Sequence, residues 1–167
     1  MTFLGDCYQP AEVDLEITRK LITIFIDHDL PFTILTKSPL ILRDVDLLGP
    51  YEKFRAGFSF TTINQMEADW WEPGTLPVAD RISALQQFAR FGKLVWISLE
   101  PVLRIESTIN VIQTLKTLPE FYWIGALNHF PPPEPVNKFD ARKRIGAVLK
   151  NLNCTYKFKN SLNFSLG

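Results

Sequence analysis

Four short apolar runs, each ending in polar residues and separated from the next by a helical pattern or a loop, limit the folds available to this chain. The runs span residues 32–36, 56–61, 94–99 and 121–127. They are too short for ordinary helices and too continuously apolar for strands with one face in water. Buried parallel strands have both properties. The sequence therefore predicts an α/β fold.

Amphipathic segments lie between and around these runs. Apolar residues recur at helical spacing in residues 13–27, 78–91 and 107–118, and Gly92 and Pro119 stand just beyond the second and third segments. In the first segment the predicted buried positions are Leu15, Thr18, Ile22 and Ile26. Alternating strands and helices predict a parallel sheet with right-handed crossovers. An open doubly wound sheet and a (β/α) barrel both satisfy this pattern.

The composition places these elements in one domain. The chain has 167 residues, of which 46% are hydrophobic, and its 18 basic and 18 acidic side chains cancel. No overall field therefore draws it to nucleic acid or to an anionic membrane. We expect a single domain over residues 1–167, in which residues 138–167 add a helix and a strand.

The absence of a long apolar run or a secretory pattern predicts a cytoplasmic protein with no membrane partner. In such a protein Cys7 and Cys154 are expected to be free thiols.

Polar residues follow the predicted strands at positions that line the active-site face of parallel α/β folds. The chain contains no glycine-rich phosphate-binding motif, which removes the main support for a nucleotide-binding Rossmann or P-loop domain. Five polar residues at successive strand ends favour a binding site; they are Asp6, Lys37, Ser59, Glu100 and Asn128.

Several segments together resemble radical S-adenosylmethionine (SAM) enzymes of the spore photoproduct lyase and DNA repair photolyase-like type. They occur in the family's order over nearly the whole chain, and they read GDCYQPAE, FTILTKSPLILRDVDLL, AGFSFTTIN, EPGTLPVADRISALQQF, VWISLEPVL and FYWIGALNHF. The resemblance implies a (β/α)6 partial TIM barrel. It also implies an activity, the reductive cleavage of SAM to a 5′-deoxyadenosyl radical.

The resemblance assigns roles to the five predicted site residues. Asp6 corresponds to the position that receives the amino group of SAM, Lys37 to a lysine near the SAM carboxylate, and Ser59 to a serine near the same cofactor. Glu100 and Asn128 fall where adenine or substrate contacts are expected. Glu72 and Arg81 resemble a pair that braces the loop after the fourth strand, with a contact from Glu72 to the cofactor as the alternative. Arg43 with Asp44 is expected to form a local structural ion pair. No catalytic residue is assigned.

The family holds a four-iron four-sulfur cluster on three cysteines spaced CxxxCxxC, and this chain contains no such motif. By resemblance, the first strand, the cluster loop and the first helix are absent, which leaves an incomplete barrel, and no metal site is predicted here. We expect a C-terminal portion that contributes SAM and substrate contacts and is inactive alone.

The expected partner of this portion is the missing segment or polypeptide, or a second copy at the uncovered barrel edge. Nucleic acid is suggested as a partner by the family only. The alternative is a non-catalytic remnant that serves as a binding or interaction module. A flavodoxin-like fold with an unrelated ligand explains none of the motif order.

Overall fold

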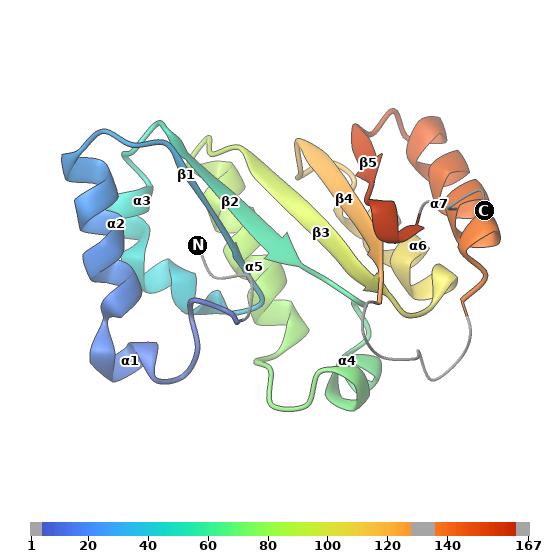
Figure 1. Cartoon of the computed structure of the whole chain (residues 1–167), viewed down its shortest axis with the longest axis horizontal. Helices are drawn as coiled ribbons and strands as arrows, with labels where there is room; N and C mark the ends of the chain where they lie inside the picture. The colour runs from blue at the N-terminus through green and yellow to red at the C-terminus, as the bar shows by residue number, and fades with distance from the viewer. Residues whose placement is uncertain (1–4, 128–135, 163–167) are drawn as a thin grey trace.

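The computed structural model, which describes residues 5–127 and 136–162, contains a five-stranded parallel sheet (Figure 1). Its strands are β1 (Phe32–Thr36), β2 (Phe54–Ser59), β3 (Val95–Val102), β4 (Phe121–Ala126) and β5 (Tyr156–Phe158), and they lie side by side in the order of the chain. The predicted α/β class and parallel sheet are confirmed. Among the described strands, this order lacks the reversal that defines a doubly wound sheet.

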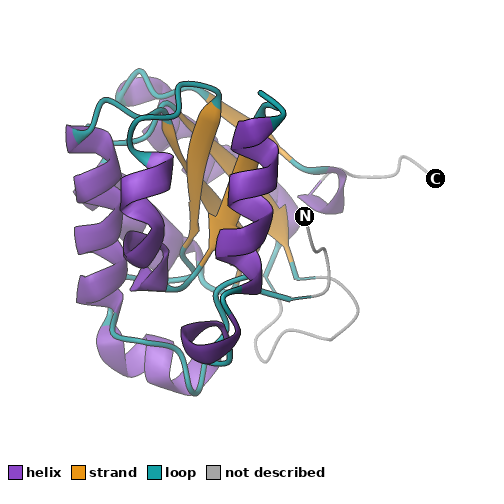
Figure 2. Cartoon of the chain, turned by 90° about the vertical axis from the view of Figure 1, so that its left-hand side faces the viewer, coloured by secondary structure: helices purple, strands orange, loops and turns teal. Residues whose placement is uncertain are grey.

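Helices connect the strands and cover one face of the sheet. They are α1 (Glu12–Leu15), α2 (Ile17–Asp27), α3 (Val45–Leu48), α4 (Gln65–Trp71), α5 (Val78–Arg90), α6 (Ile105–Leu115) and α7 (Lys138–Asn151), with 3₁₀ segments η1 (Pro39–Asp44) and η2 (Asn160–Leu162). Helices α5 and α6 lie behind the strands in Figure 1. In Figure 2, viewed from the side on which α2 lies, helices stand in front of the strands. No described helix is long and apolar enough to cross a membrane.

The two faces of the sheet differ because successive strand residues point to opposite sides. Ile34, Phe58, Ile97 and Ile124 point toward the helices and are almost fully buried. The residues between them point to the opposite face, where Leu35 is 40% exposed. The sheet therefore has one face in the hydrophobic core and one face open to a ligand.

The predicted elements are recovered with shifted ends. β1 has the predicted bounds, whereas β2 begins at Phe54 and α6 begins at Ile105. The predicted helix over residues 13–27 is wrong at Glu16, where a left-handed backbone (φ 51°) separates α1 from α2. The break leaves Leu15 52% exposed instead of buried. It is stabilised by the carboxylate of Glu12, which accepts a hydrogen bond from the Thr18 amide at 3.0 Å.

A buried aspartate fastens the N-terminal segment to the rest of the domain. Asp44 is fully buried and pairs with Arg43 at 3.0 Å, which confirms the predicted local ion pair. It also pairs with Arg19 of α2 at 3.0 Å and accepts a hydrogen bond from the Tyr8 hydroxyl at 2.9 Å. Because these groups satisfy the carboxylate, they join the N-terminal loop, α2 and η1 into one unit.

Candidate functional site

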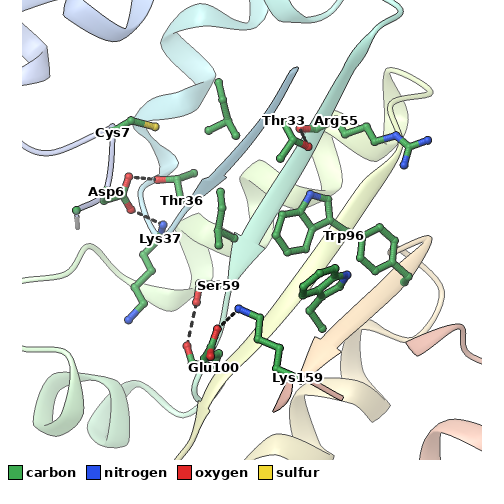
Figure 3. Close-up of a pocket in the computed structure, with 15 residues that line it drawn as sticks. Asp6, Cys7, Thr33, Thr36, Lys37, Arg55, Ser59, Trp96, Glu100 and Lys159 are labelled. Carbon is green, nitrogen blue, oxygen red and sulfur yellow. Dashed lines mark hydrogen bonds and ion pairs between the residues drawn. The ribbon is translucent and has the colours of Figure 1, made fainter. Parts of the chain in front are cut away.

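Four of the five predicted site residues line one cavity on the open face of the sheet (Figure 3). The cavity has a volume of about 740 Å³, which is in the range of small-molecule sites. Asp6, Lys37, Ser59 and Glu100 line it near the carboxyl ends of the strands. The fifth residue, Asn128, lies outside the described residues.

Asp6 accepts three hydrogen bonds, two of which hold it against the end of β1. Its Oδ1 accepts from the Tyr8 amide at 2.9 Å and from the Thr36 hydroxyl at 2.6 Å. Its Oδ2 accepts from the Lys37 amide at 2.6 Å. A carboxylate has about four acceptor positions, so one on Oδ2 remains for another donor. Asp6 therefore has a structural role and keeps room for an ammonium group.

Lys37 belongs to a buried polar network centred on Glu72. The Lys37 Nζ lies 2.7 Å from Glu72 Oε1, which also accepts from the Thr61 hydroxyl at 2.9 Å. On the other side, two guanidinium nitrogens of Arg81 lie 3.2 Å from Glu72 Oε2. Burial alone would raise the pKa of Glu72, but Lys37, Arg81 and Thr61 together bring it below its ordinary value. Glu72 is therefore an anion that holds the Lys37 ammonium.

Arg81 connects this network to the strand ends and confirms the predicted pairing with Glu72. Its side chain is fully buried, its Nε donates to the Lys37 carbonyl at 2.9 Å and one Nη donates to the Ser59 carbonyl at 2.8 Å. The guanidinium also lies 5.3 Å from the centre of the Phe60 ring. These contacts fix the ends of β1 and β2 relative to each other, so they set the position of the Lys37 side chain.

Ser59 and Glu100 are neighbours across β2 and β3. The Ser59 hydroxyl lies 3.4 Å from the Glu100 carbonyl, and the Glu100 carboxylate forms an ion pair with Lys159. A Cβ added to Gly125 would lie 2.5 Å from Glu100 Oε1, so the absence of a side chain there leaves the space that Glu100 occupies. The carboxylate therefore points over the open face rather than into the core.

The opposite end of the cavity is aromatic. Trp96 and Phe121 stack with 5.5 Å between ring centroids and 2° between planes, and Trp123 tilts against both. The Trp96 indole extends over the neighbouring strand, where a Cβ on Gly57 would lie 2.3 Å from the ring. The cavity thus joins a charged end to an aromatic end.

Neither cysteine is placed as a metal ligand. Burial, reinforced by the charge of Asp6, raises the pKa of the Cys7 thiol to about 12, so the thiol stays protonated near neutral pH. Cys154 is also free, which confirms the prediction of unpaired thiols. Within residues 5–127 and 136–162, no group of three or more His, Cys, Asp or Glu side chains is arranged to hold a metal ion.

Sequence reasoning did not identify the aromatic residues or Lys159 as parts of the site. Trp96 and Trp123 stand in continuously apolar strands and resemble core residues there. The sequence did contain one signal for Trp96. Side chains along a strand alternate between the two faces of the sheet, and Trp96 and Glu100 are an even number of residues apart, so they share a face. Lys159 follows β5, which pairs with β4 and brings the C-terminal segment to the cavity.

Comparison with known proteins gives one curated relative, and no protein-family model matches the chain. The relative is the uncharacterized protein MJ0683 of Methanocaldococcus jannaschii, which is 30% identical over 132 residues. The match covers 77% of this chain and 49% of the relative. The chain thus spans about half the length of this protein.

Comparison with solved structures gives a match to the fold. The chain is similar to Streptococcus suis SuiB, with a TM-score of 0.67 and 14% identity over 84% of this chain and 35% of SuiB. The crystal structure of SuiB bound to S-adenosylmethionine gives the same TM-score, and that of SuiB bound to its precursor peptide SuiA gives 0.68. The chain has the fold of part of SuiB.

Proposed function

We propose that this chain is the C-terminal part of a radical SAM enzyme of the spore photoproduct lyase-like type, and that it contributes SAM and substrate contacts. The observation that carries the proposal is the convergence of Asp6, Lys37, Ser59 and Glu100 on one cavity. The fold match adds support, because SuiB has been solved with SAM bound. In this proposal the five strands form part of a (β/α)6 barrel whose inner face is the open face of the sheet.

The chemistry of these residues fits the amino acid portion of SAM. The Lys37 ammonium has three N–H donors. One contacts Glu72, and the others are available to the SAM carboxylate. Asp6 keeps an acceptor position on Oδ2 for an amino group. Ser59 offers a hydroxyl, and Glu100 offers a carboxylate to a ribose or substrate hydroxyl. Bound SAM would supply the reactive group, and these side chains would orient it.

The residues of this chain do not fit an iron–sulfur cluster. A cluster needs three thiolates, whereas Cys7 is held in its protonated form and Cys154 lies on another part of the fold, after α7. We therefore propose that the cluster ligands belong to another segment or polypeptide. The coverage of only half of the relative is consistent with such a division.

The first edge of the sheet offers a place for that segment. Within the described residues β1 pairs only with β2, so its other edge has unpaired backbone groups. Beside it, Ile17, Leu21 and Ile24 of α2 are 51%, 40% and 51% exposed. We propose that a strand and helix of the missing segment cover this surface, and that self-association through it is the alternative. Nucleic acid as a partner rests on the family resemblance alone.

The same exposed surface favours a second candidate function. A non-catalytic binding or interaction module would also present an apolar face and an unpaired strand edge to its partner. The two candidates differ at the cavity, because only the first requires the charged end to bind SAM.

Calorimetric titration of the chain with SAM tests the proposal. We expect weak binding that is lost in Lys37→Ala and kept in the control Lys143→Ala, whose side chain is exposed on α7. No binding by the unaltered chain would favour the interaction module. After anaerobic reconstitution with iron and sulfide, we expect no reductive cleavage of SAM by this chain alone. Cleavage under those conditions would contradict the proposal that the cluster ligands lie elsewhere.

A further inference from the structure

The aromatic end of the cavity contains a feature that the SAM contacts do not use. Trp96, Phe121 and Trp123 form a row of rings across β3 and β4 on the open face, and each ring is only partly buried. Aromatic rings in a protein core are usually fully packed. These three rings instead line a cavity and are partly exposed. Rings in this position provide stacking surfaces for a planar ligand.

Cations stand at both ends of this row. On one side, Arg55 of β2 lines the cavity, and one of its guanidinium nitrogens lies 4.0 Å from the Glu120 carboxylate, with both side chains about half exposed. On the other side, Lys157 of β5 lies with its Nζ 5.5 Å from the centre of the Trp123 ring. Lys159 lies equally close to that ring, but its charge is balanced by Glu100. The aromatic row therefore carries positive charge at its margins.

The register of the sheet sets the size of this surface. Arg55 is two residues before Gly57, which pairs with Trp96, and Trp123 pairs directly with Lys157. Three strand spacings of about 4.8 Å separate β2 from β5, and the register places Lys157 level with Ser59, four residues beyond Arg55, so the Cα atoms of the two cationic residues are about 20 Å apart. The aromatic row lies between them, so a ligand stacked on it would reach one of the two cations.

The missing side chain at Gly57 is part of this arrangement. A Cβ there would lie 2.3 Å from the Trp96 indole, so glycine allows the indole to lie over β2 rather than stand away from the sheet. The labelled Trp96 ring in Figure 3 lies over the strands beside the cavity. A residue with a side chain at this position would displace the ring and remove the surface.

We propose that this aromatic and cationic surface binds a small planar aromatic molecule that carries an anionic group. The ring would stack on Trp96 and Trp123, and the anion would pair with Arg55 or Lys157. The inference does not rest on SAM binding, because none of these side chains is among the proposed SAM contacts. A nucleotide and an aromatic carboxylate share this chemistry, and the test distinguishes them.

Calorimetric titration with four probes tests each part of the surface. We expect adenosine monophosphate to bind, adenosine to bind more weakly, and ribose 5-phosphate, which has no aromatic ring, not to bind. Binding of 1-naphthoate as well as the nucleotide would assign the site to aromatic anions in general. Binding of the nucleotide without naphthoate would assign it to nucleotides. Failure of both aromatic anions to bind would overturn the proposal, as would equal binding of ribose 5-phosphate.

Variants connect binding to the named residues. Trp123→Ala should weaken binding of adenosine monophosphate about fivefold to a hundredfold, and Trp123→Phe should restore most of it. Lys157→Ala should weaken binding about threefold. The controls are Trp70→Ala, which removes a 76% exposed ring from α4, and Lys143→Ala. Equal effects of the Trp70 and Trp123 variants would overturn the proposal, and so would a dimer in sedimentation whose interface covers the face and excludes the probes.

Discussion

Replacement of Arg81 by methionine gives a strong test of the buried network at the strand ends. The substitution keeps a long side chain but removes one of the two cations that pair with Glu72, whose side chain is only 4% exposed. Breaking a buried ion pair by removing one member costs about 3–5 kcal/mol in the free energy of unfolding. The Lys37 and Ser59 carbonyls also lose donors at 2.9 and 2.8 Å. Lys37 and Thr61 still contact Glu72, so the expected loss is near the middle of that range, about 4 kcal/mol.

Urea unfolding followed by circular dichroism measures this loss. For a domain that unfolds with a slope of about 2 kcal/mol per molar, a loss of 4 kcal/mol lowers the urea midpoint by about 2 M. Arg90→Met is the matched control, because Arg90 is an exposed residue at the end of the same helix. If the two variants have similar midpoints, Arg81 does not hold the network together.

The pH dependence of the urea midpoint tests the same network. The pKa of Glu72 is depressed in the folded chain, so the ionised carboxylate stabilises the fold above its unfolded pKa. That contribution is lost as the pH falls through the lower folded pKa. The urea midpoint of the unaltered chain should therefore fall on acidification more than that of Glu72→Gln. Parallel pH profiles for the two proteins would contradict the depressed pKa.

Three further substitutions or reactions test separate contacts. Gly57→Ala should lower the free energy of unfolding by about 1–3 kcal/mol, measured in urea, because the new methyl overlaps Trp96; an unchanged midpoint would refute the close approach. Tyr8→Phe removes a 2.9 Å hydrogen bond to buried Asp44 and should cost about 1–3 kcal/mol in the same assay, against a smaller loss for Tyr51→Phe, whose half-buried side chain donates to the neutral Leu30 carbonyl at 2.8 Å. Cys7 should react with iodoacetamide at pH 8 about a thousandfold more slowly than a free cysteine, and alkylation at the ordinary rate would contradict its raised pKa.

The sequence predicted parallel strands from continuously apolar runs, and these runs implied burial on both faces of the sheet. The sheet is parallel, but only one face packs against helices, and on the other face Leu35 is 40% exposed. The continuous apolar run of β1 fixes its ends at Phe32 and Thr36. Polar residues after the strands predicted the charged end of the cavity, since the carboxyl ends of parallel strands meet at one edge. Lys37, Ser59 and Glu100 were found by this rule, whereas Asp6 precedes β1 and its assignment also needed the family resemblance.

Other features depend on contacts that a pattern does not contain. The break at Glu16 interrupts a continuous amphipathic pattern, and it is stabilised by Glu12 and its hydrogen bond to the Thr18 amide. Trp96 stands between the buried residues Val95 and Ile97, so hydrophobicity alone does not reveal that it faces a cavity. The aromatic end of the site became visible only when the strand register had placed its rings on one face.

The two residues with the clearest SAM roles differ in what their replacement would measure. Asp6 already accepts three hydrogen bonds, two of which hold the N-terminal segment on the end of β1, so Asp6→Asn would disturb the fold and the proposed amino contact together. Lys37 makes its structural contacts through its backbone, whereas its ammonium contacts only the Glu72 side chain among the described ion pairs. Truncating that side chain leaves the backbone bonds of Lys37 to Asp6 and Arg81 in place. Loss of SAM binding in Lys37→Ala with an unchanged urea midpoint would therefore assign the ammonium to the ligand, and a lowered midpoint would assign it to the Glu72 network.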